Sequence, residues 1–345
     1  MSPRRPDLTK LLAPRSVAVV GAAPIGQGIR GRALEVLRMH AFAGAVHPVS
    51  RSLAEVQGLK AYPSVAALPE TPELAVLVIP AANVPDELER CGKAGVGAAV
   101  VISSGFAEEA GEAGRASQQR LRAIADRYGM ALLGPNSEGF ATLGAKLCVT
   151  FSPAVADTSL PLIPEGKRGR IAVVAQSGGM GFAFYDRGRP KGLAFSHVVT
   201  TGNEAQLEVF DVVEHLIDRD EADVFLLLVE DVKTAATFVR AGRKAQAAGK
   251  PIIAVKIGKS DAGQRAAKSH TAALAGSYAA FSAMARSLGM IEAHELDEAV
   301  DLAQAFLAWR QLPPKGRRVA ICTASGGGGG WLADASSAAG LEVPL

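Results

Sequence analysis

The chain has 345 residues, a length that fits two or three domains of about 100–200 residues each. Hydrophobic residues make up 48% and charged residues 21%, so the composition is that of a globular protein and excludes wholesale disorder. The formal net charge of +3 is too small for a dedicated nucleic-acid binder. No stretch approaches the roughly 20 apolar residues of a membrane-spanning helix. We therefore expect neither a nucleic-acid nor a membrane partner.

The three cysteines, Cys91, Cys148 and Cys322, stand far apart and form no CxxC pair. This spacing argues against a zinc knuckle or a disulfide framework, so the sequence predicts no metal site and is typical of a reducing compartment. The N-terminal residues 1–10 are not followed by the apolar run of a signal peptide. We expect a cytoplasmic protein.

Short apolar strands alternate with amphipathic helices in the first part of the chain. Strands are predicted at 16–23, 45–50, 74–80 and 97–104, and helices at 31–42, 65–70, 84–95 and 116–129, and residues 131–140 close the unit. Such alternation is typical of parallel strands joined by right-handed crossovers. Residues 8–145 are therefore predicted to form a Rossmann-like α/β domain.

Residues 151–168 have the composition of a linker, and a second series of strands and helices follows. Strands are expected within 169–176, 194–203, 222–231 and 250–258, with helices at 209–220, 238–249, 278–289 and 295–312. We interpret residues 166–294 as a flavodoxin-like doubly wound domain. Residues 316–345 repeat its opening pattern of strand, Ser-Gly-Gly turn and helix. They predict the beginning of a second flavodoxin-like domain, and hence a fragment of something longer.

A glycine-rich turn follows the first predicted strand. Gly21, Gly26 and Gly28 are spaced more loosely than the G-x-G-x-x-G fingerprint, so the turn favours a phosphate-bearing nucleotide without excluding an ordinary tight turn. NAD fits poorly, because the second strand is followed by Ser50 and Arg51 rather than by an acid. A basic residue at this point favours a phosphorylated ribose.

A second turn, Ser177-Gly178-Gly179, lies between a strand and a helix, where exposed N–H groups suit a phosphate. It is not the G-x-S-x-G elbow of hydrolases, because Ala175 occupies the position of the first glycine. His270 lies among small residues and is a candidate nucleophile, although a packed or surface histidine fits the same pattern. Glu230 ends a buried strand and is a candidate to orient that histidine, or else an exposed turn acid.

Several longer motifs together resemble a known family. They are SVAVVGAAP, VIPAANV, ISSGFAE, LLGPNSEGF, VVAQSGGMG, GNEA, LLLVED and KSDAGQRAAKSHTAALAG. They are similar to those of the NDP-forming (ADP-forming) acyl-CoA synthetases, relatives of the succinyl-CoA synthetase α subunit. The resemblance covers nearly the whole chain, and SHTAALAG is its most specific part. Ala272 is a glycine in many relatives, a small departure that leaves His270 in place.

The resemblance implies a role for each candidate residue. His270 matches the histidine that is phosphorylated during turnover, Glu230 the acid that orients it, and Ser177, Gly178 and Gly179 the helix start that holds the phosphate. The residues expected to contact coenzyme A are Gly21, Ala22, Gly26, Gln27, Gly28, Pro48, Ser50, Arg51, Ile79, Pro80, Ser103, Gly105, Phe106 and Asn136.

The implied reaction is acid + CoA + NTP ⇌ acyl-CoA + NDP + phosphate, by way of an acyl phosphate and a phosphohistidine. The family also needs an ATP-grasp domain or β subunit that binds ATP or another NTP with Mg²⁺, and we expect that site to lie outside this chain, in an oligomeric protein. A CoA-sensing regulatory module of a lysine acetyltransferase-like protein is the main alternative, and an NAD(P)-dependent oxidoreductase is a further one. The sequence leaves open which acid is used, and whether ATP or GTP.

Overall fold

The computed structural model describes residues 6–109, 111–166, 169–263, 265, 277–311 and 315–344. Its contacts divide the chain into two compact units, Met1–Gln304 and Ala305–Leu345. The first unit contains both large sheets and all the described candidate residues. The predicted His270 lies outside the described residues.

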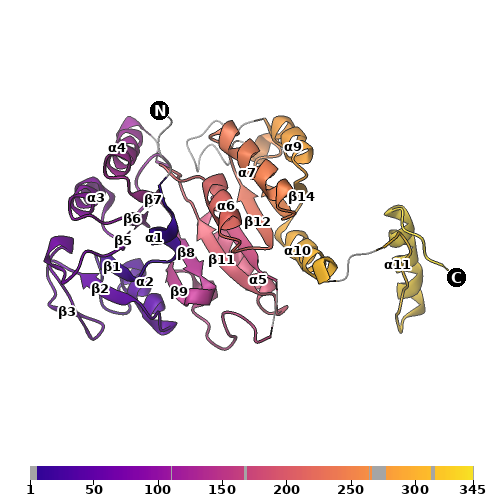
Figure 1. Ribbon diagram of the computed structural model, residues 1–345, viewed down its shortest axis with the longest axis horizontal. Helices are drawn as coiled ribbons and strands as arrows, with labels where there is room; N and C mark the ends of the chain where they lie inside the picture. The colour runs from indigo at the N-terminus through magenta and orange to yellow at the C-terminus, as the bar shows by residue number, and fades with distance from the viewer. Residues whose placement is uncertain are drawn as a thin grey trace. The chain divides into compact units, whose positions relative to one another are not determined.

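The first sheet has five parallel strands in the order β2-β1-β5-β6-β7 (Figure 1). Its strands are β1 (Ser16–Val20), β2 (Ala45–Val49), β5 (Leu74–Leu77), β6 (Ala98–Val101) and β7 (Ala131–Leu133). The helices of this part are α1 (Thr9–Leu12), α2 (Gly28–Met39), α3 (Val84–Lys93) and α4 (Glu112–Tyr128), and a short hairpin joins β3 (Glu55–Val56) to β4 (Leu59–Lys60). The chain turns to opposite sides of β1 to form β2 and β5. Doubly wound proteins bind their ligands at the carboxyl ends of the strands at such a point.

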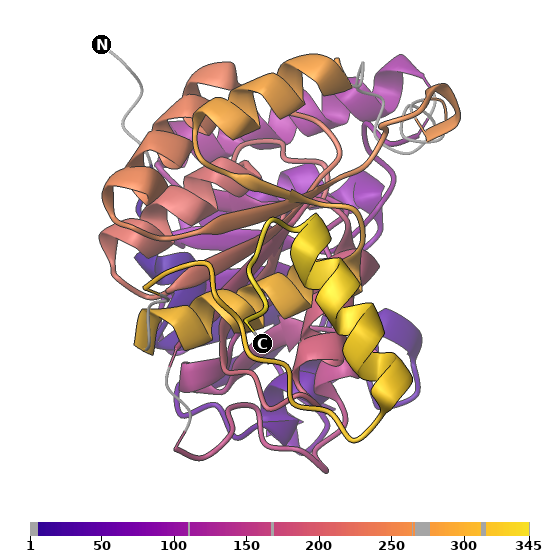
Figure 2. The same cartoon turned by 90° about the vertical axis from the view of Figure 1, so that its right-hand side faces the viewer.

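The second sheet has seven strands in the order β14-β13-β12-β10-β11-β8-β9. Figures 1 and 2 show it from two directions. Its strands are β8 (Gly139–Thr142), β9 (Leu147–Thr150), β10 (Ile171–Ala175), β11 (Phe195–Thr200), β12 (Val224–Val229), β13 (Ile252–Lys256) and β14 (Ile291–Ala293). The helices are α5 (Gly178–Gly188), α6 (Val209–Asp218), α7 (Ala235–Ala247), α9 (Tyr278–Ser287) and α10 (Leu296–Gln311). The five strands from β14 to β11 are parallel, which confirms the predicted flavodoxin-like arrangement.

Strands β8 and β9 were not predicted from the sequence. They pair antiparallel with each other, and β8 also pairs antiparallel with β11, so residues 139–150 extend the second sheet although they follow the last strand of the first. A neighbouring strand edge supplies the hydrogen bonds that this segment needs, and no local pattern reveals that edge.

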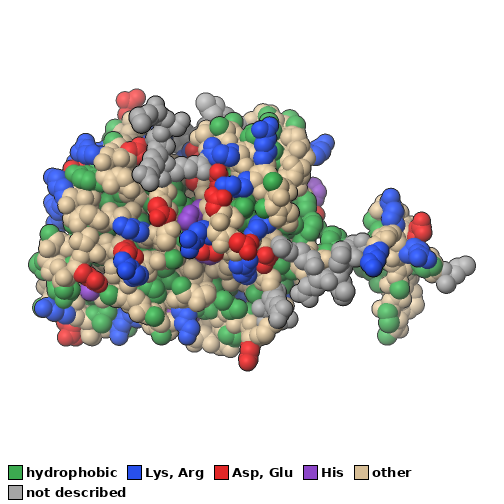
Figure 3. Space-filling model, viewed as in Figure 1, with side chains coloured by type: hydrophobic (Ala, Val, Ile, Leu, Met, Phe, Trp, Pro, Cys, Tyr) green, Lys and Arg blue, Asp and Glu red, His purple; other side chains and the backbone are tan. Residues whose placement is uncertain are grey.

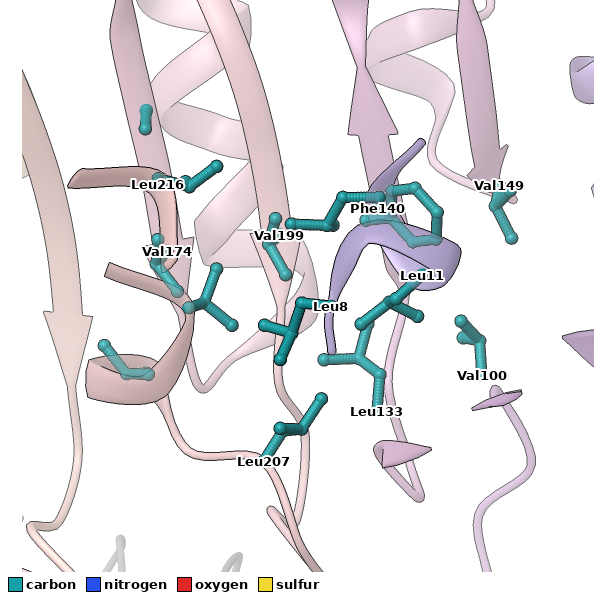
Figure 4. Packing of buried hydrophobic residues seen from close by; sticks show 14 of the residues in the cluster. Leu8, Leu11, Val100, Leu133, Phe140, Val149, Val174, Val199, Leu207 and Leu216 are labelled. Carbon is teal, nitrogen blue, oxygen red and sulfur yellow. The ribbon is translucent and has the colours of Figure 1, made fainter. Parts of the chain in front are cut away.

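The two sheets share one hydrophobic core (Figure 4). Leu8 and Leu11 at the N-terminal end lie between Leu133 of the first sheet and Phe140 and Val199 of the second. Leu11, Leu133, Phe140 and Val199 are fully buried. The burial is continuous across the junction, so a cavity there, such as that left by a lost leucine side chain, would cost about 2–5 kcal/mol.

In the C-terminal unit, α11 (Gly326–Ala338) forms after the Ser-Gly-Gly turn, as the internal repeat predicts. The strand expected before it does not form: residues 319–324 have no regular structure, and only an isolated bridge joins Arg318 to Glu342. The prediction of this strand is wrong because a single strand has no sheet to pair with in the described part of the unit.

Candidate functional site

A cavity of about 200 Å³ opens at the carboxyl ends of β1, β2 and β5, where the strand order reverses. Five of the residues predicted to contact CoA line it: Gly21, Ser50, Arg51, Ile79 and Pro80. The other lining residues are Val20, Arg30, Val49, Ser52, Pro63, Asn83 and Glu87. Three segments that are far apart in the sequence therefore meet at the edge where this fold binds ligands.

Gly21 forms the floor of the turn after β1. Its φ is +89°, and a Cβ added there would lie 2.4 Å from the carbonyl oxygen of Val78, so only glycine fits. The Nε of Arg30 donates to the Gly21 carbonyl at 2.9 Å and folds the first turn of α2 over this glycine. The turn presents backbone and a guanidinium to the cavity, a combination that suits a phosphate.

An acidic side chain, Glu87, lies in the wall of the same cavity. It is only 4% exposed, and its Oε2 lies 3.4 Å from a guanidinium nitrogen of Arg51 and 2.6 Å from one of Arg90. Glu87 therefore holds Arg51, the predicted phosphate ligand, at the mouth of the cavity. Sequence reasoning missed it because it looked for an acid only after the second strand, whereas Glu87 stands in the first turn of α3 after the third predicted strand.

The remaining residues predicted for CoA do not line this cavity: they are Ala22, Gly26, Gln27, Gly28, Pro48, Ser103, Gly105, Phe106 and Asn136. Pro48 lies within β2, and the side chain of Phe106 is fully buried in the core. The N–H groups of Gly105 and Phe106 donate to the carboxylate of Glu108, at 2.6 and 3.2 Å. The Ser103 hydroxyl donates to the Ile79 carbonyl at 2.5 Å and so fixes this loop beside the cavity wall.

Asn136 lies where the first sheet meets the second. Its N–H donates to the Ser103 carbonyl at 2.9 Å, and its Nδ2 donates to Oδ1 of Asn203 at 3.2 Å. Asn203 in turn donates to Glu108 and, at 3.0 Å, to Gln118. These hydrogen bonds connect the segment that contains Ser103, Gly105 and Phe106 to the turn after β11, which is the GNEA motif of the sequence.

Ser177, Gly178 and Gly179, the residues predicted to hold the phosphate, lie at the start of α5 and form the predicted phosphate cradle. Ser177 is the N-cap of this helix and makes no capping bond with its side chain. Gly178 and Gly179 follow it, and the carboxyl group of Glu138 lies beside them: a Cβ added to Gly178 would be 2.8 Å from Glu138 Oε2. Burial raises the pKa of Glu138, and a hydrogen bond with Ser152 opposes this in part. Sequence reasoning missed Glu138 although it lies in the LLGPNSEGF motif.

Glu230 follows the last residue of β12 and is half-buried. Its N–H donates to Oε1 of Gln176 at 2.5 Å, and its carbonyl accepts from Nζ of Lys256 at 2.6 Å. Burial lowers the pKa of Lys256, while the nearby carboxylates of Asp231 and Glu230 oppose that shift. The structure places Glu230 at the same sheet edge as Ser177, whereas its relation to His270 lies outside the described residues.

Two buried polar residues behind this edge carry no predicted role. Gln176 directly precedes Ser177, and Glu204 belongs to the GNEA turn; they are joined by a bond from Gln176 Nε2 to Glu204 Oε2 at 2.7 Å. Burial raises the pKa of Glu204 to about 7, and the charge of Lys233, whose Nζ lies 4.0 Å from the carboxyl group, opposes the shift. Their position at strand ends is the signal that could have found them.

The buried cysteines and the described acidic side chains indicate neither a reactive thiolate nor a metal site. Cys91 and Cys148 are buried, and burial raises the pKa of each to about 12, so neither is a reactive thiolate. Within the described residues no group of three His, Cys, Asp or Glu side chains is placed to hold a metal ion. Among the described helices, none is both long and apolar enough to cross a membrane. The face in Figure 3 intersperses basic and acidic side chains over the sheet domains.

Two family models match the chain. One describes a CoA binding domain and covers residues 15–142; the other describes a succinyl-CoA ligase like flavodoxin domain and covers residues 168–306. Together with the two sheets, these matches define a CoA-binding Rossmann domain joined to a flavodoxin domain of the succinyl-CoA ligase type.

The similarity to individual proteins shows which family the chain belongs to. ADP-forming acetate–CoA ligase I of Archaeoglobus fulgidus is 39% identical over 98% of this chain and 46% of its own length. The α subunit of ADP-forming acetate–CoA ligase II of Pyrococcus furiosus is 36% identical over 96% of this chain and 68% of its own. A solved structure, the dinucleotide forming acetyl-coenzyme A synthetase 1 of Ca. Korarchaeum cryptofilum with phosphate and ADP, has a TM-score of 0.86 at 32% identity, covering 98% of this chain and 70% of that one.

The chain belongs to the family of ADP-forming acetate–CoA ligases, which confirms the predicted resemblance. It spans about half the length of the Archaeoglobus relative and two thirds of the Pyrococcus α subunit.

Proposed function

We propose that the chain is the CoA-binding and phosphohistidine-bearing part of an ADP-forming acyl-CoA ligase. The observation that carries the proposal is the cavity at the carboxyl ends of β1, β2 and β5, where Gly21, Ser50 and Arg51 lie together. The fit to CoA rests on the missing Cβ of Gly21, which lets a ligand approach the backbone, and on the guanidinium groups of Arg30 and Arg51 at the cavity. When bound, CoA supplies the thiol that receives the acyl group.

In this proposal the residues at the edge of the first sheet bind CoA, and those at the edge of the second sheet hold the phosphoryl group. Gly21, Arg30 and Arg51 hold the phosphates of CoA, and Ser177, Gly178 and Gly179 hold the phosphoryl group at the start of α5. His270 takes a phosphoryl group from the NTP, which leaves as NDP, and passes it to the carboxylate of the acid. Glu230 accepts a hydrogen bond from the other ring nitrogen, so that the attacking nitrogen keeps its lone pair.

The rest of the enzyme is proposed from the relatives. An ATP-grasp region, on the same protein or on a β subunit in an oligomer, binds ATP or another NTP with Mg²⁺. Acetate is the first acid to assay, since several relatives are named acetate–CoA ligases. A cytoplasmic location is proposed from the free thiols of Cys91, Cys148 and Cys322. The alternative of a regulatory module is not favoured, because the reported relatives are named as ligases or as a synthetase.

The test is to incubate the full protein, with its ATP-grasp region or subunit, with ATP labelled on the γ-phosphate. We expect acid-labile, base-stable label on the wild type and none on His270→Ala, which also loses acyl-CoA formation but keeps its affinity for CoA. His294→Ala is the matched control, because His294 is exposed and should keep the label. A His270→Ala protein that makes acyl-CoA at the normal rate would contradict the proposal.

A further inference from the structure

The side-chain amide of Gln176 joins three segments behind the edge of the second sheet. Its Oε1 accepts from the N–H of Glu230 at 2.5 Å and from the N–H of Asp231 at 2.9 Å. Its Nε2 donates to the Asp231 carbonyl at 2.9 Å and to Glu204 Oε2 at 2.7 Å. Two donors and two acceptors are thus all engaged, and Gln176 is 8% exposed.

Glu204 fixes the amide from the other side. Its carboxyl group also accepts from the Thr201 hydroxyl at 3.0 Å and from the N–H of Val209 at 2.9 Å, with Lys233 Nζ 4.0 Å away. The two N–H groups that follow β12 require an acceptor, so the amide oxygen of Gln176 faces them and its NH₂ group faces Glu204. The reversed amide would set donors against donors.

Gln176 also borders the predicted phosphate cradle directly, because the next residue is Ser177, the N-cap of α5. One side chain therefore sets the path of the chain at Glu230 and is covalently attached to the start of α5. An acid that must meet an imidazole nitrogen within hydrogen-bond reach tolerates little displacement of its backbone.

We propose that Gln176 and Glu204 are positioning residues that hold Glu230 in its catalytic orientation. The inference rests on the proposed function, in which Glu230 orients the phosphorylated histidine. Neither Gln176 nor Glu204 touches the reacting atoms; each acts through the backbone of residues 230–231. The effect of losing Gln176 should accordingly depend on Glu230 being present, which a purely structural role would not require.

The test is a double-mutant cycle on the rate of phosphoryl labelling in the full protein. Gln176→Ala should slow labelling about 10-fold in the wild-type background, a usual effect of losing a residue that orients a functional side chain. In the Glu230→Gln background the same change should alter the rate less than about twofold, because its target is already gone. Affinity for CoA should be unchanged in all four proteins. Glu204→Gln, which keeps the shape of the side chain, should give the same pattern and serves if Gln176→Ala does not fold.

Gln206→Ala is the matched control. The Gln206 amide also joins two segments, donating to Asp126 at 2.8 Å and accepting from the N–H of Leu132 at 2.8 Å, but it contacts neither Glu230 nor Asp231. Its effect should be equal in both backgrounds.

A Gln176→Ala effect that is undiminished in Glu230→Gln overturns the inference alone. If Glu230→Gln labels normally while His270→Ala does not, the inference and the role of Glu230 fail together. If wild type acquires no label, the proposed function fails and takes the inference with it.

Discussion

The carboxyl group of Glu138 lies against the backbone of Gly178, the first residue of helix α5. A Cβ built on Gly178 would be 2.6 Å from the Cβ of Glu138 and 2.8 Å from its Oε2. A residue from the segment after the first sheet thus closes one side of the helix start that the sequence predicts to hold phosphate. This contact limits the space at Gly178 and places a carboxyl group beside any anion bound there.

Gly178→Ala should lower the free energy of unfolding by about 1–3 kcal/mol, because the added methyl group overlaps Glu138. Because Ala is more favourable than Gly inside a helix, helix propensity alone would predict a gain in stability. Gly179→Ala is the control, since its Cβ would lie 3.8 Å from Glu138 Oε2, an ordinary contact. Urea unfolding of the two variants measures the difference, and equal stabilities would contradict the overlap.

Glu138→Gln should bind sulfate at α5 about 5-fold more tightly near pH 7, because a carboxylate a few ångströms from an anion opposes it by about 1 kcal/mol. Sulfate is the probe because it keeps its charge from pH 5 to pH 8. Burial raises the pKa of Glu138, so the advantage of the variant should shrink as the pH falls and the wild type takes up a proton. Glu112→Gln, in the first turn of α4, is the control. Titration calorimetry giving equal affinities at pH 8 would be the contrary result.

Arg51→Ala should weaken CoA binding by about 1–3 kcal/mol if its guanidinium meets a phosphate. Arg90→Ala removes the other partner of Glu87, at 2.6 Å, but Arg90 does not line the cavity and should leave the affinity unchanged. Calorimetry at two salt concentrations should show the weaker salt dependence in Arg51→Ala only. Equal losses in both variants would mean that Arg51 acts only through Glu87.

His197 should make the protein less stable in mild acid. Burial lowers its pKa to about 4 from 6.5, so below pH 6.5 the unfolded chain gains a proton that the folded chain does not. Stability is therefore lost as the pH falls from about 6.5 toward 4, by about 3 kcal/mol over the full window. His197→Gln should remove this part of the loss, and His294→Gln, at an exposed position, should not. Unfolding free energies at pH 7.5 and pH 5 give the comparison, and parallel losses in wild type and His197→Gln would refute it.

The order of strands and helices could be predicted because each buried parallel strand is a short apolar run and each crossover helix has its own period. Val17, Leu74 and Val224 lie in such runs and are fully buried. Local patterns do not encode the partner of a strand, which is why β8 and β9 were missed and a strand was wrongly expected at 319–324.

The candidate residues divide in the same way. Gly21, Ser50 and Arg51 could be found because the end of a strand is visible in the sequence and the fold brings strand ends together. Glu87, Glu138 and Glu204 could not, since their importance comes from neighbours 36, 40 and 28 positions away: Arg51, Gly178 and Gln176. A single sequence shows which side chains exist at an edge, whereas the pairing of buried charges is a property of the assembled core.

The common core of the two sheets has a consequence for how chemistry could pass between their edges. A pair of domains with separate cores can swing on a hinge, but here Leu11 is buried by both sheets at once. Bending at this junction would expose apolar surface, at about 25 cal/mol for each Å². We therefore expect the spacing between the Gly21 turn and the start of α5 to change little, so any molecule that contacts both must be long enough to reach from one to the other.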